Sequence, residues 1–174
     1  LAAALRDYVV NYGVSTGDRT VVVTNNDDAY RTAIVLKQAG LEVPVIIDAR
    51  PEGGGALMAK ARDMGIRVDT GRAIAKVKGG KRVTGVQICA QAGEGSVLEE
   101  IPCDAVAMSG GWSPVVHLWS HCGGKLIWDD AQAHFRPEPS RPPTGASGEG
   151  FVIAAGSANG ALALDAALAD ATAA

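Results

Sequence analysis

The side chains best placed for ligand chemistry lie where an apolar run gives way to a helical pattern. Residues 24–29 read Thr24-Asn25-Asn26-Asp27-Asp28-Ala29, directly after a β-branched run over residues 19–24. A strand that turns into a helix offers free N–H groups and a partial positive charge, and dinucleotide-binding folds hold a pyrophosphate there. The GxGxxG pattern of those folds is lost, and only its last small residue remains, as Ala29. We therefore expect a weakened or lost nucleotide site with Thr24, Asn26 and Ala29 as candidate contacts.

The side chains of this turn argue against a phosphate. Asn26 tolerates a left-handed backbone better than most residues, but its side chain fills space that phosphate oxygens would use. Asp27 and Asp28 add negative charge at the same place. The alternative for these two carboxylates is that they only cap the following helix.

Asp48 is the second candidate contact, at the end of the next apolar run over residues 43–48. Dinucleotide-binding folds place an acid about 20 residues after the glycine turn, where it binds the adenosine ribose. Such an acid favours NAD over NADP, because it repels the 2′-phosphate, although Arg50 nearby blurs that preference. The alternative is a strand-end carboxylate that caps the following loop. The spacing fits the first interpretation and the altered turn fits the second, so both stay open.

The sequence offers no catalytic or metal constellation. No serine stands in a GxSxG elbow, so we expect no Ser-His-Asp arrangement. A metal cluster would have to draw on His117, His121, Cys122 and His134. Gly123-Gly124 and the apolar residues beside them indicate a packed loop instead, and no metal site is expected.

The elements that must position these residues change character along the chain. Helical patterns over residues 1–12, 29–37 and 56–64 alternate with apolar runs over residues 19–24, 43–48 and 66–69. Gly13 is expected to end the first helix. The runs lack polar alternation, which is typical of strands buried on both faces. This β-α-β-α-β order predicts a parallel sheet.

The pattern then changes to short strands over residues 73–78, 82–91 and 96–101, separated by Gly79-Gly80 and Gly93-Glu94-Gly95. They predict an antiparallel meander, after which residues 103–108 return as a buried strand. Residues 136–150 are rich in Pro, Ser and Gly and predict a loop. Residues 151–156 predict another strand, followed by an alanine-rich helix that starts near Asn159.

The fold class expected is therefore α/β: a Rossmann-like parallel sheet with an inserted antiparallel β-meander. We expect two parts, a nested NAD(P)/FAD-type domain over residues 1–118 and a further segment over residues 119–174. The chain begins Leu1-Ala2-Ala3, without a methionine and already in helical composition. We expect a piece of a longer protein.

Composition argues against nucleic acid and membranes as partners. The 174 residues carry a net charge of −3, and aromatic residues make up only 5%. Neither steering toward nucleic acid nor base stacking is expected. No apolar run approaches the ~18 residues of a membrane span. Three cysteines without a CxxC pair favour a reducing, cytoplasmic compartment.

Several strings in this order resemble the alpha subunit of heterotetrameric sarcosine oxidase. The match covers essentially the whole chain, and its most specific parts are the Thr-Asn-Asn-Asp turn and the Gly-Gly-Trp-Ser-Pro stretch. The strings are Arg6-Asp7-Tyr8, Tyr12-Gly13-Val14, Val23-Thr24-Asn25-Asn26-Asp27-Asp28-Ala29-Tyr30, Gly110-Gly111-Trp112-Ser113-Pro114-Val115-Val116-His117-Leu118, Cys122-Gly123-Gly124-Lys125-Leu126 and Ala155-Gly156-Ser157-Ala158-Asn159-Gly160.

The resemblance implies an oxidoreductase that demethylates sarcosine to glycine and reduces oxygen to hydrogen peroxide. The one-carbon unit can pass to tetrahydrofolate. Four subunits (alpha, beta, gamma and delta) carry FAD, FMN and NAD, and the amine-oxidising flavin belongs to the beta subunit. This chain is similar to the second, nested dinucleotide-binding domain of the alpha subunit, followed by the segment that returns to the first. It therefore implies a non-catalytic scaffold domain that itself binds no cofactor.

The resemblance also directs attention to the turn over residues 155–160. In flavoproteins of this kind the late turn approaches the dinucleotide bound in the first domain. Gly156 would allow close backbone approach, and a helix starting near Asn159 would direct its dipole at phosphates. Ser157 stands where many relatives carry an acid for the flavin's ribityl chain, which weakens the case for flavin. The alternative is a plain strand-to-helix turn.

Two other functions remain open. An active reductase would bind NAD(P)H and pass hydride to a flavin, and it predicts a working phosphate turn. A ligand-free subunit-interaction module predicts a dispensable Asp48 and exposed apolar surface around Trp119 and Phe151.

Overall fold

The computed structural model describes residues 1–92 and 95–174, so Gly93 and Glu94 of the expected Gly93-Glu94-Gly95 turn lie outside the described residues. Contacts divide the chain into two compact units, Leu1–Gly111 and Trp112–Ala174. This division precedes the boundary at 118/119 that the sequence suggested. Each unit is described separately.

The first unit contains the predicted alternation of helices and strands, followed by the meander. Its elements are α1 (Ala2–Asp7), the π-helical turn η1 (Tyr8–Tyr12), β1 (Thr20–Thr24), α2 (Asp28–Gln38), β2 (Ile46–Asp48), α3 (Gly55–Asp63), β3 (Val68–Thr70), β4 (Arg72–Gly79), β5 (Val83–Ala90), β6 (Glu99–Pro102) and β7 (Ala105–Ser109). Gly13 ends η1 with a left-handed φ of 65°, as expected of a helix-terminating glycine.

The parallel sheet has the strand order β3-β2-β1-β7. Val21 and Val22 of β1 are both fully buried, and so are Ile46 and Ile47 of β2. Because successive side chains of a strand point to opposite faces, this sheet must be covered on both sides. The absence of polar alternation in the sequence therefore predicted the burial correctly.

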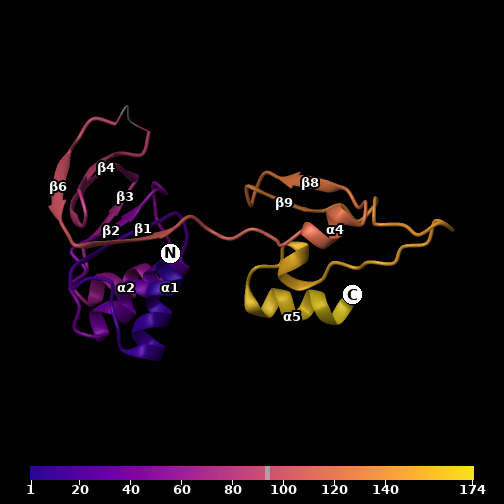
Figure 1. The fold of residues 1–174 in the computed structure, drawn as a ribbon, viewed down its shortest axis with the longest axis horizontal. Helices are drawn as coiled ribbons and strands as arrows, with labels where there is room; N and C mark the ends of the chain where they lie inside the picture. The colour runs from indigo at the N-terminus through magenta and orange to yellow at the C-terminus, as the bar shows by residue number, and fades with distance from the viewer. Residues whose placement is uncertain (93–94) are drawn as a thin grey trace. The chain divides into compact units, whose positions relative to one another are not determined.

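Helices cover one face of this sheet and the meander covers the other (Figure 1). Val22 and Ile46 share a core with residues of α1, α2 and α3, including the fully buried Leu36. Val21 and Ile47 share a second core with meander residues such as Ile88. The meander pairs in the order β4-β5-β6 and is antiparallel throughout, as predicted. The α/β class with its inserted meander is confirmed.

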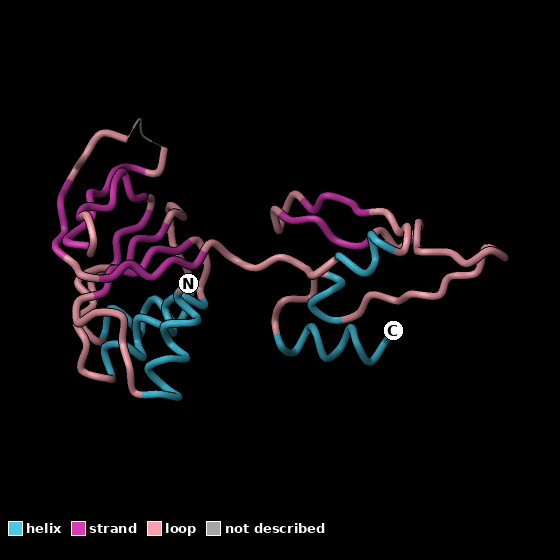
Figure 2. Tube along the Cα trace, viewed as in Figure 1, coloured by secondary structure: helices cyan, strands magenta, loops and turns pink. Residues whose placement is uncertain are grey.

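The second unit contains α4 (His117–His121), β8 (Leu126–Asp129), β9 (His134–Pro137), the 3₁₀ turn η2 (Gly156–Asn159) and α5 (Leu164–Ala173). The strands β8 and β9 form an antiparallel hairpin that the sequence did not reveal (Figure 2). Its turn lacks glycine, and Ala133 takes the left-handed conformation at φ 52°. Trp128 and Phe135 stack edge to face across it at 5.0 Å.

Two expectations for the second unit were wrong. Residues 151–155 are irregular rather than a strand, and the helix begins at Leu164 instead of near Asn159. A strand needs a neighbour for its backbone hydrogen bonds, and the hairpin of this unit pairs only with itself among the described residues. Gly160, at φ 99°, ends η2 with a left-handed residue and separates it from α5.

Candidate functional site

The candidate site lies at the carboxyl edge of the parallel sheet, where three strands end side by side. Thr24 of β1 is in register with Asp48 of β2 and with Ser109 of β7. The turn from β1 into α2 passes over this edge. In parallel sheets this is where ligands bind.

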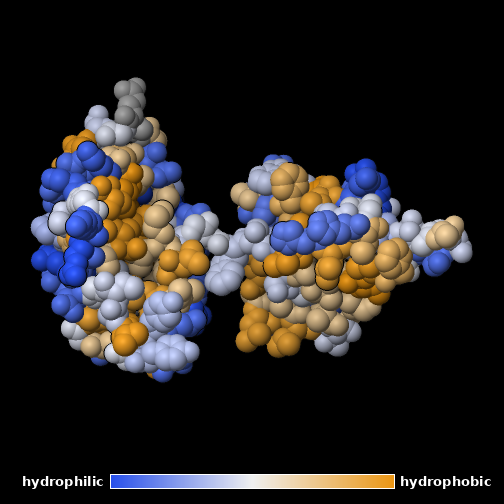
Figure 3. Space-filling model, viewed as in Figure 1, coloured by the Kyte–Doolittle hydropathy of each residue, from blue (hydrophilic) through white to orange (hydrophobic). Residues whose placement is uncertain are grey.

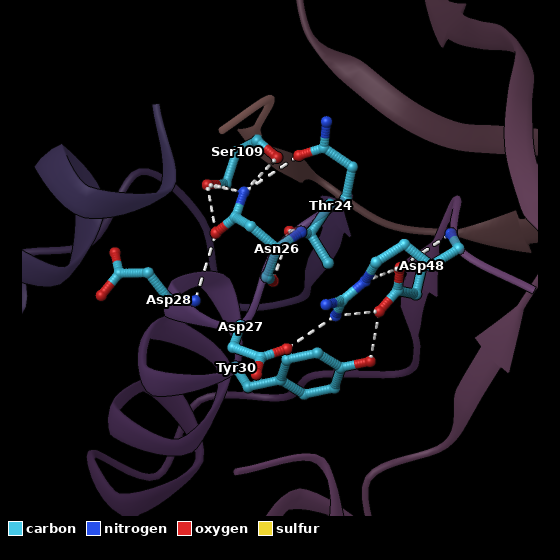
Figure 4. A network of polar contacts seen from close by, with 9 residues as sticks. Thr24, Asn26, Asp27, Asp28, Tyr30, Asp48 and Ser109 are labelled. Carbon is cyan, nitrogen blue, oxygen red and sulfur yellow. Dashed lines mark hydrogen bonds and ion pairs between the residues drawn. The ribbon is translucent and has the colours of Figure 1, made fainter. Parts of the chain in front are cut away.

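Asn26 fastens that turn to the neighbouring strand and to the helix (Figure 4). Its side-chain nitrogen donates to the carbonyl oxygen and to the hydroxyl of Ser109, at 3.1 Å and 3.0 Å. Its side-chain oxygen accepts the backbone N–H of Asp28 at 3.1 Å. Thr24 Oγ1 accepts the N–H of Asn26 at 3.0 Å. Side chains of this turn therefore occupy an amide that a phosphate would need.

The sequence suggested Asp27 and Asp28 as helix caps, and the structure corrects this. Asp27 makes no capping hydrogen bond with its side chain, and Asn26 supplies the cap instead. Nor does Asn26 use the left-handed backbone that its residue type allows, since Ala133 is the non-glycine residue at positive φ in the described ranges. Asparagine and aspartate cap helices about equally well, so residue type alone could not distinguish them.

Asp48 is fully buried beneath the turn. One carboxylate oxygen accepts the Tyr30 hydroxyl at 2.7 Å and an Nη of Arg50 at 2.7 Å. The other accepts the Arg50 backbone N–H at 2.9 Å and its Nε at 3.1 Å. Asp48 therefore caps the loop that follows β2. All four hydrogen bonds come from within the chain.

This network shifts the protonation equilibria of its members. Burial alone would raise the pKa of Asp48, but hydrogen bonds from Arg50 and Tyr30 outweigh it and lower that pKa. Burial and the neighbouring Asp48 carboxylate raise the pKa of Tyr30. The carboxylate is thus charged, the phenol neutral and the guanidinium charged at neutral pH.

The remaining acids of the turn are paired as well. Asp27 lies 2.8 Å from Arg50, and Asp28 lies 3.1 Å from Arg6 and 3.7 Å from Arg31. A Cβ at Gly54 would meet the Asp27 carboxylate, so a larger residue there would push this carboxylate from its present place. The cluster offers no surplus positive charge for a pyrophosphate.

Ala29 and the late turn complete the predicted set. Ala29 is 1% exposed and packs into the helix-side core. In the second unit, Gly156 adopts φ 61°, and its N–H donates to Asp170 Oδ2 at 2.7 Å. Asn159 Nδ2 donates to Asp170 Oδ1 at 3.1 Å, while Ser157 is exposed. A carboxylate of α5 thus takes two donors of the turn that the resemblance placed near a dinucleotide.

Sequence reasoning missed four residues that organise these sites: Tyr30, Arg50 as an internal partner, Ser109 and Asp170. Only Arg50 carried a sequence signal, since it follows Asp48 by two positions. The pairings to Ser109 and Asp170 arise from register and helix packing. Within residues 1–92 and 95–174 no cluster of three or more metal-ligating side chains occurs. No helix in the same ranges is long and apolar enough to cross a bilayer.

Comparison with solved structures supports the fold. The thioredoxin reductase of T. acidophilum is similar with a TM-score of 0.56 and 20% identity, covering 88% of this chain and 52% of that one. The bacillithiol disulfide reductase of Staphylococcus aureus gives a TM-score of 0.54 at 14% identity, covering 70% and 36%. At these identities the two reductases support the fold class alone.

Comparison with curated sequences supplies the family, although no family model matches the chain. The sarcosine oxidase subunit alpha of Rhizobium meliloti (strain 1021) is 37% identical over 135 residues, which are 78% of this chain and 13% of that protein. The subunit of the same name from Corynebacterium sp. (strain P-1) is 38% identical over 142 residues, or 79% and 14%. The chain therefore spans about one-seventh of these relatives' length, and it belongs to the sarcosine oxidase alpha-subunit family, of whose members it matches one segment.

Proposed function

We propose that this chain is the nested, dinucleotide-binding-type domain of a sarcosine oxidase alpha subunit and acts there as a non-catalytic scaffold. The whole enzyme would oxidise sarcosine to glycine and form hydrogen peroxide. It would use FAD, FMN and NAD, assemble with beta, gamma and delta subunits, pass its one-carbon unit to tetrahydrofolate and work in the cytoplasm. Residues 1–118 would form the nested domain, and residues 119–174 would lead back to the first dinucleotide-binding domain.

The observation that supports the scaffold role is that hydrogen bonds within the chain already occupy Asp48, the residue that would bind a ribose. Asp48 has no exposed surface and already accepts four hydrogen bonds from Tyr30 and Arg50. A ribose would have to displace these partners before it could bind the carboxylate. Leaving a buried charged group without its partners costs about 3–5 kcal/mol, a large part of the ~8 kcal/mol that corresponds to micromolar affinity.

Charge adds to this barrier. A pyrophosphate at the amino end of α2 would approach the carboxylates of Asp27 and Asp28. Asp27 and Asp28 are neutralised by ion pairs with Arg6, Arg31 and Arg50, so these arginines have no net positive charge left to offer a phosphate. An active reductase would instead need positive charge that remains available to the pyrophosphate.

The second unit supports a structural role next to further chain. Its helix α5 has no buried residue, and Ile153, Leu164 and Leu168 are 73%, 77% and 61% exposed. Hydrophobic residues extend over the face of this unit that carries α5 (Figure 3). Exposed apolar surface of this kind marks an interface. We infer that this segment packs against the first dinucleotide-binding domain, whose cofactor Gly156, Ser157 and Asn159 would then approach.

The interaction-module alternative fits this surface only in part. Phe151 is 57% exposed, as that alternative requires, but Trp119 is 6% exposed and donates to the Lys125 carbonyl at 2.7 Å. Asp48 holds the first unit together, so it is not dispensable. A scaffold with an unpartnered second unit accounts for both observations.

Thermal unfolding with added nucleotides tests the scaffold role. We expect no change of the midpoint beyond ~1 °C when NAD, NADP or FAD is added separately at millimolar concentration, because the Asn26 side chain already takes the Asp28 amide and Tyr30 and Arg50 already enclose Asp48. A ligand at 100 times its dissociation constant would stabilise the fold by about 2.7 kcal/mol, which corresponds to several degrees. A shift with NAD alone that disappears in Asp48→Asn would support the reductase instead. Asn26→Gly, which frees the Asp28 amide, is the matched variant for regained binding.

A further inference from the structure

A pocket lies between the edge strand β3 and the meander of the first unit. Its volume is about 280 Å³, and the residues that line it include Arg67, Asp69, Thr70, Arg72, Leu98 and Glu99. Sites for drug-sized ligands usually enclose about 300–1,000 Å³, so a pocket of this size suits a ligand of few heavy atoms. The Asp48 network described above contains none of these side chains.

One wall of the pocket is an arginine held between two carboxylates. Arg67 Nη2 lies 2.6 Å from an oxygen of Asp69 on β3 and 2.6 Å from an oxygen of Glu99 on β6. Its Nε and Nη1 donate to the remaining two oxygens, both at 2.9 Å. A carboxylate has about four lone-pair positions, and Arg67 takes two on each acid. Two carboxylates against one guanidinium leave this wall negative, with acceptor positions still available.

The other wall is positive. Arg72 begins β4 and is half-buried, and its guanidinium forms no ion pair or hydrogen bond within residues 1–92 and 95–174. Arginine stays protonated in proteins, so this wall carries a full positive charge. Thr70, at the end of β3, adds a hydroxyl to the same pocket.

The pocket also offers a small apolar surface. Leu98 is 56% exposed, and its backbone N–H donates to the Ile88 carbonyl at 2.9 Å, which holds this residue beside β5. An apolar group of a ligand would lose contact with water by covering the Leu98 side chain.

We propose that this pocket binds a small zwitterion, an α-amino acid with an apolar side chain. The α-carboxylate pairs with Arg72 and the Thr70 hydroxyl, and the α-ammonium pairs with the carboxylates of Asp69 and Glu99. The side chain covers Leu98. A ligand with a single charge would gain from one wall and be repelled by the other, whereas a zwitterion gains from both. The inference does not depend on the proposed function, since no residue of the Asp48 network takes part.

A titration of the full ¹⁵N-labelled chain with L-leucine, followed by NMR, tests the proposal. We expect saturable shifts of the backbone amide resonances of residues 67–72 and 98–99 at millimolar L-leucine. Isopentylamine has the same apolar group and lacks the carboxylate, and isocaproate lacks the ammonium. Each should bind at least about tenfold more weakly, because a hydrogen bond to a charged group corresponds to a factor of that size.

A pair of variants on β4 locates the site. Arg72→Gln removes the positive wall, so the affinity for L-leucine should fall about tenfold, as it does for the analogue without a carboxylate. Lys76→Gln is the matched control, since it removes the same charge from an exposed position on the same strand and Lys76 does not line the pocket. It should bind L-leucine as the wild type does.

The proposal is overturned if L-leucine causes no saturable shift of these resonances in the millimolar range. Isocaproate binding as tightly as L-leucine would mean a simple anion site, and isopentylamine doing so would mean a simple cation site. Unchanged affinity in Arg72→Gln would equally contradict the proposal. If that variant fails to fold, visible as loss of the dispersed spectrum, the two analogues decide the question on the wild-type chain. NAD binding would be read from residues 24–30, so the two outcomes are distinguishable.

Discussion

Replacing Asp48 by alanine will lower the free energy of unfolding by about 3 kcal/mol. The substitution removes a fully buried carboxylate and leaves Arg50 and the Tyr30 hydroxyl without their acceptor. Breaking a buried ion pair from one side costs about 3–5 kcal/mol. The lower end applies here, because the Arg50 side chain is 31% exposed and keeps Asp27 as a partner.

Urea unfolding followed by circular dichroism measures this loss, and the thermal midpoint should fall by roughly 6–12 °C. Tyr30→Phe is the matched control, since it removes one of the four hydrogen bonds and leaves the ion pair intact. Its expected cost is about 1–2 kcal/mol. If Asp48→Ala proved no more destabilising than Tyr30→Phe, the carboxylate would not be the centre of this network.

The second large effect concerns the two faces of the sheet. Ile46→Ala and Ile47→Ala should each cost about 2–5 kcal/mol, because both side chains are fully buried. They are sequence neighbours on one strand and point into different cores, one beneath the helices and one beneath the meander. A sheet with one solvent-facing side would show a large loss for only one of the pair.

Chemical unfolding of both variants measures the two losses. Val77→Ala in the meander is the control, because Val77 is 45% exposed and its truncation should change stability by less than about 0.5 kcal/mol. A loss below 1 kcal/mol for Ile47→Ala would mean that the meander does not cover the sheet as the structure shows.

The parts of the fold that the sequence predicted are those in which local pattern and burial agree. The continuous β-branched run at residues 20–24 left no polar face, so a sheet covered on both sides was the consistent solution. The short strands after β3, separated by glycines, indicated an antiparallel meander. Gly13 and Gly79 stood where the chain must reverse, and both adopt positive φ.

The hairpin and the end of the chain could not be predicted in the same way. The β8–β9 hairpin turns through Ala133 in a conformation that alanine rarely adopts, so no turn signal marked it. Residues 151–155 have the composition of a strand, but they pair with no neighbouring strand in the part of the chain that the structure describes. Local pattern indicates what a segment can form, and the available partners decide whether it forms.

The candidate site shows the same limit on a smaller scale. Sequence spacing placed Thr24, Asn26 and Asp48 at one edge of the sheet, and the structure brings them there. The spacing could not reveal that Ser109, 83 positions from Asn26, would accept a hydrogen bond from the Asn26 side-chain amide. Nor could it reveal that Tyr30 and Arg50 would enclose Asp48. The choice between a ribose acceptor and a loop cap depended on these tertiary partners.

We propose that side chains of this chain close the turn between β1 and α2 to a dinucleotide. The most direct measurement is a titration of the ¹⁵N-labelled chain with NAD, in which the backbone amide resonances of residues 24–30 and 48–50 are followed by NMR. We predict that these resonances do not move up to millimolar NAD. Saturable shifts of the Asp28 and Ala29 amides, together with those of Asp48 and Arg50, would contradict the claim and identify a working nucleotide site.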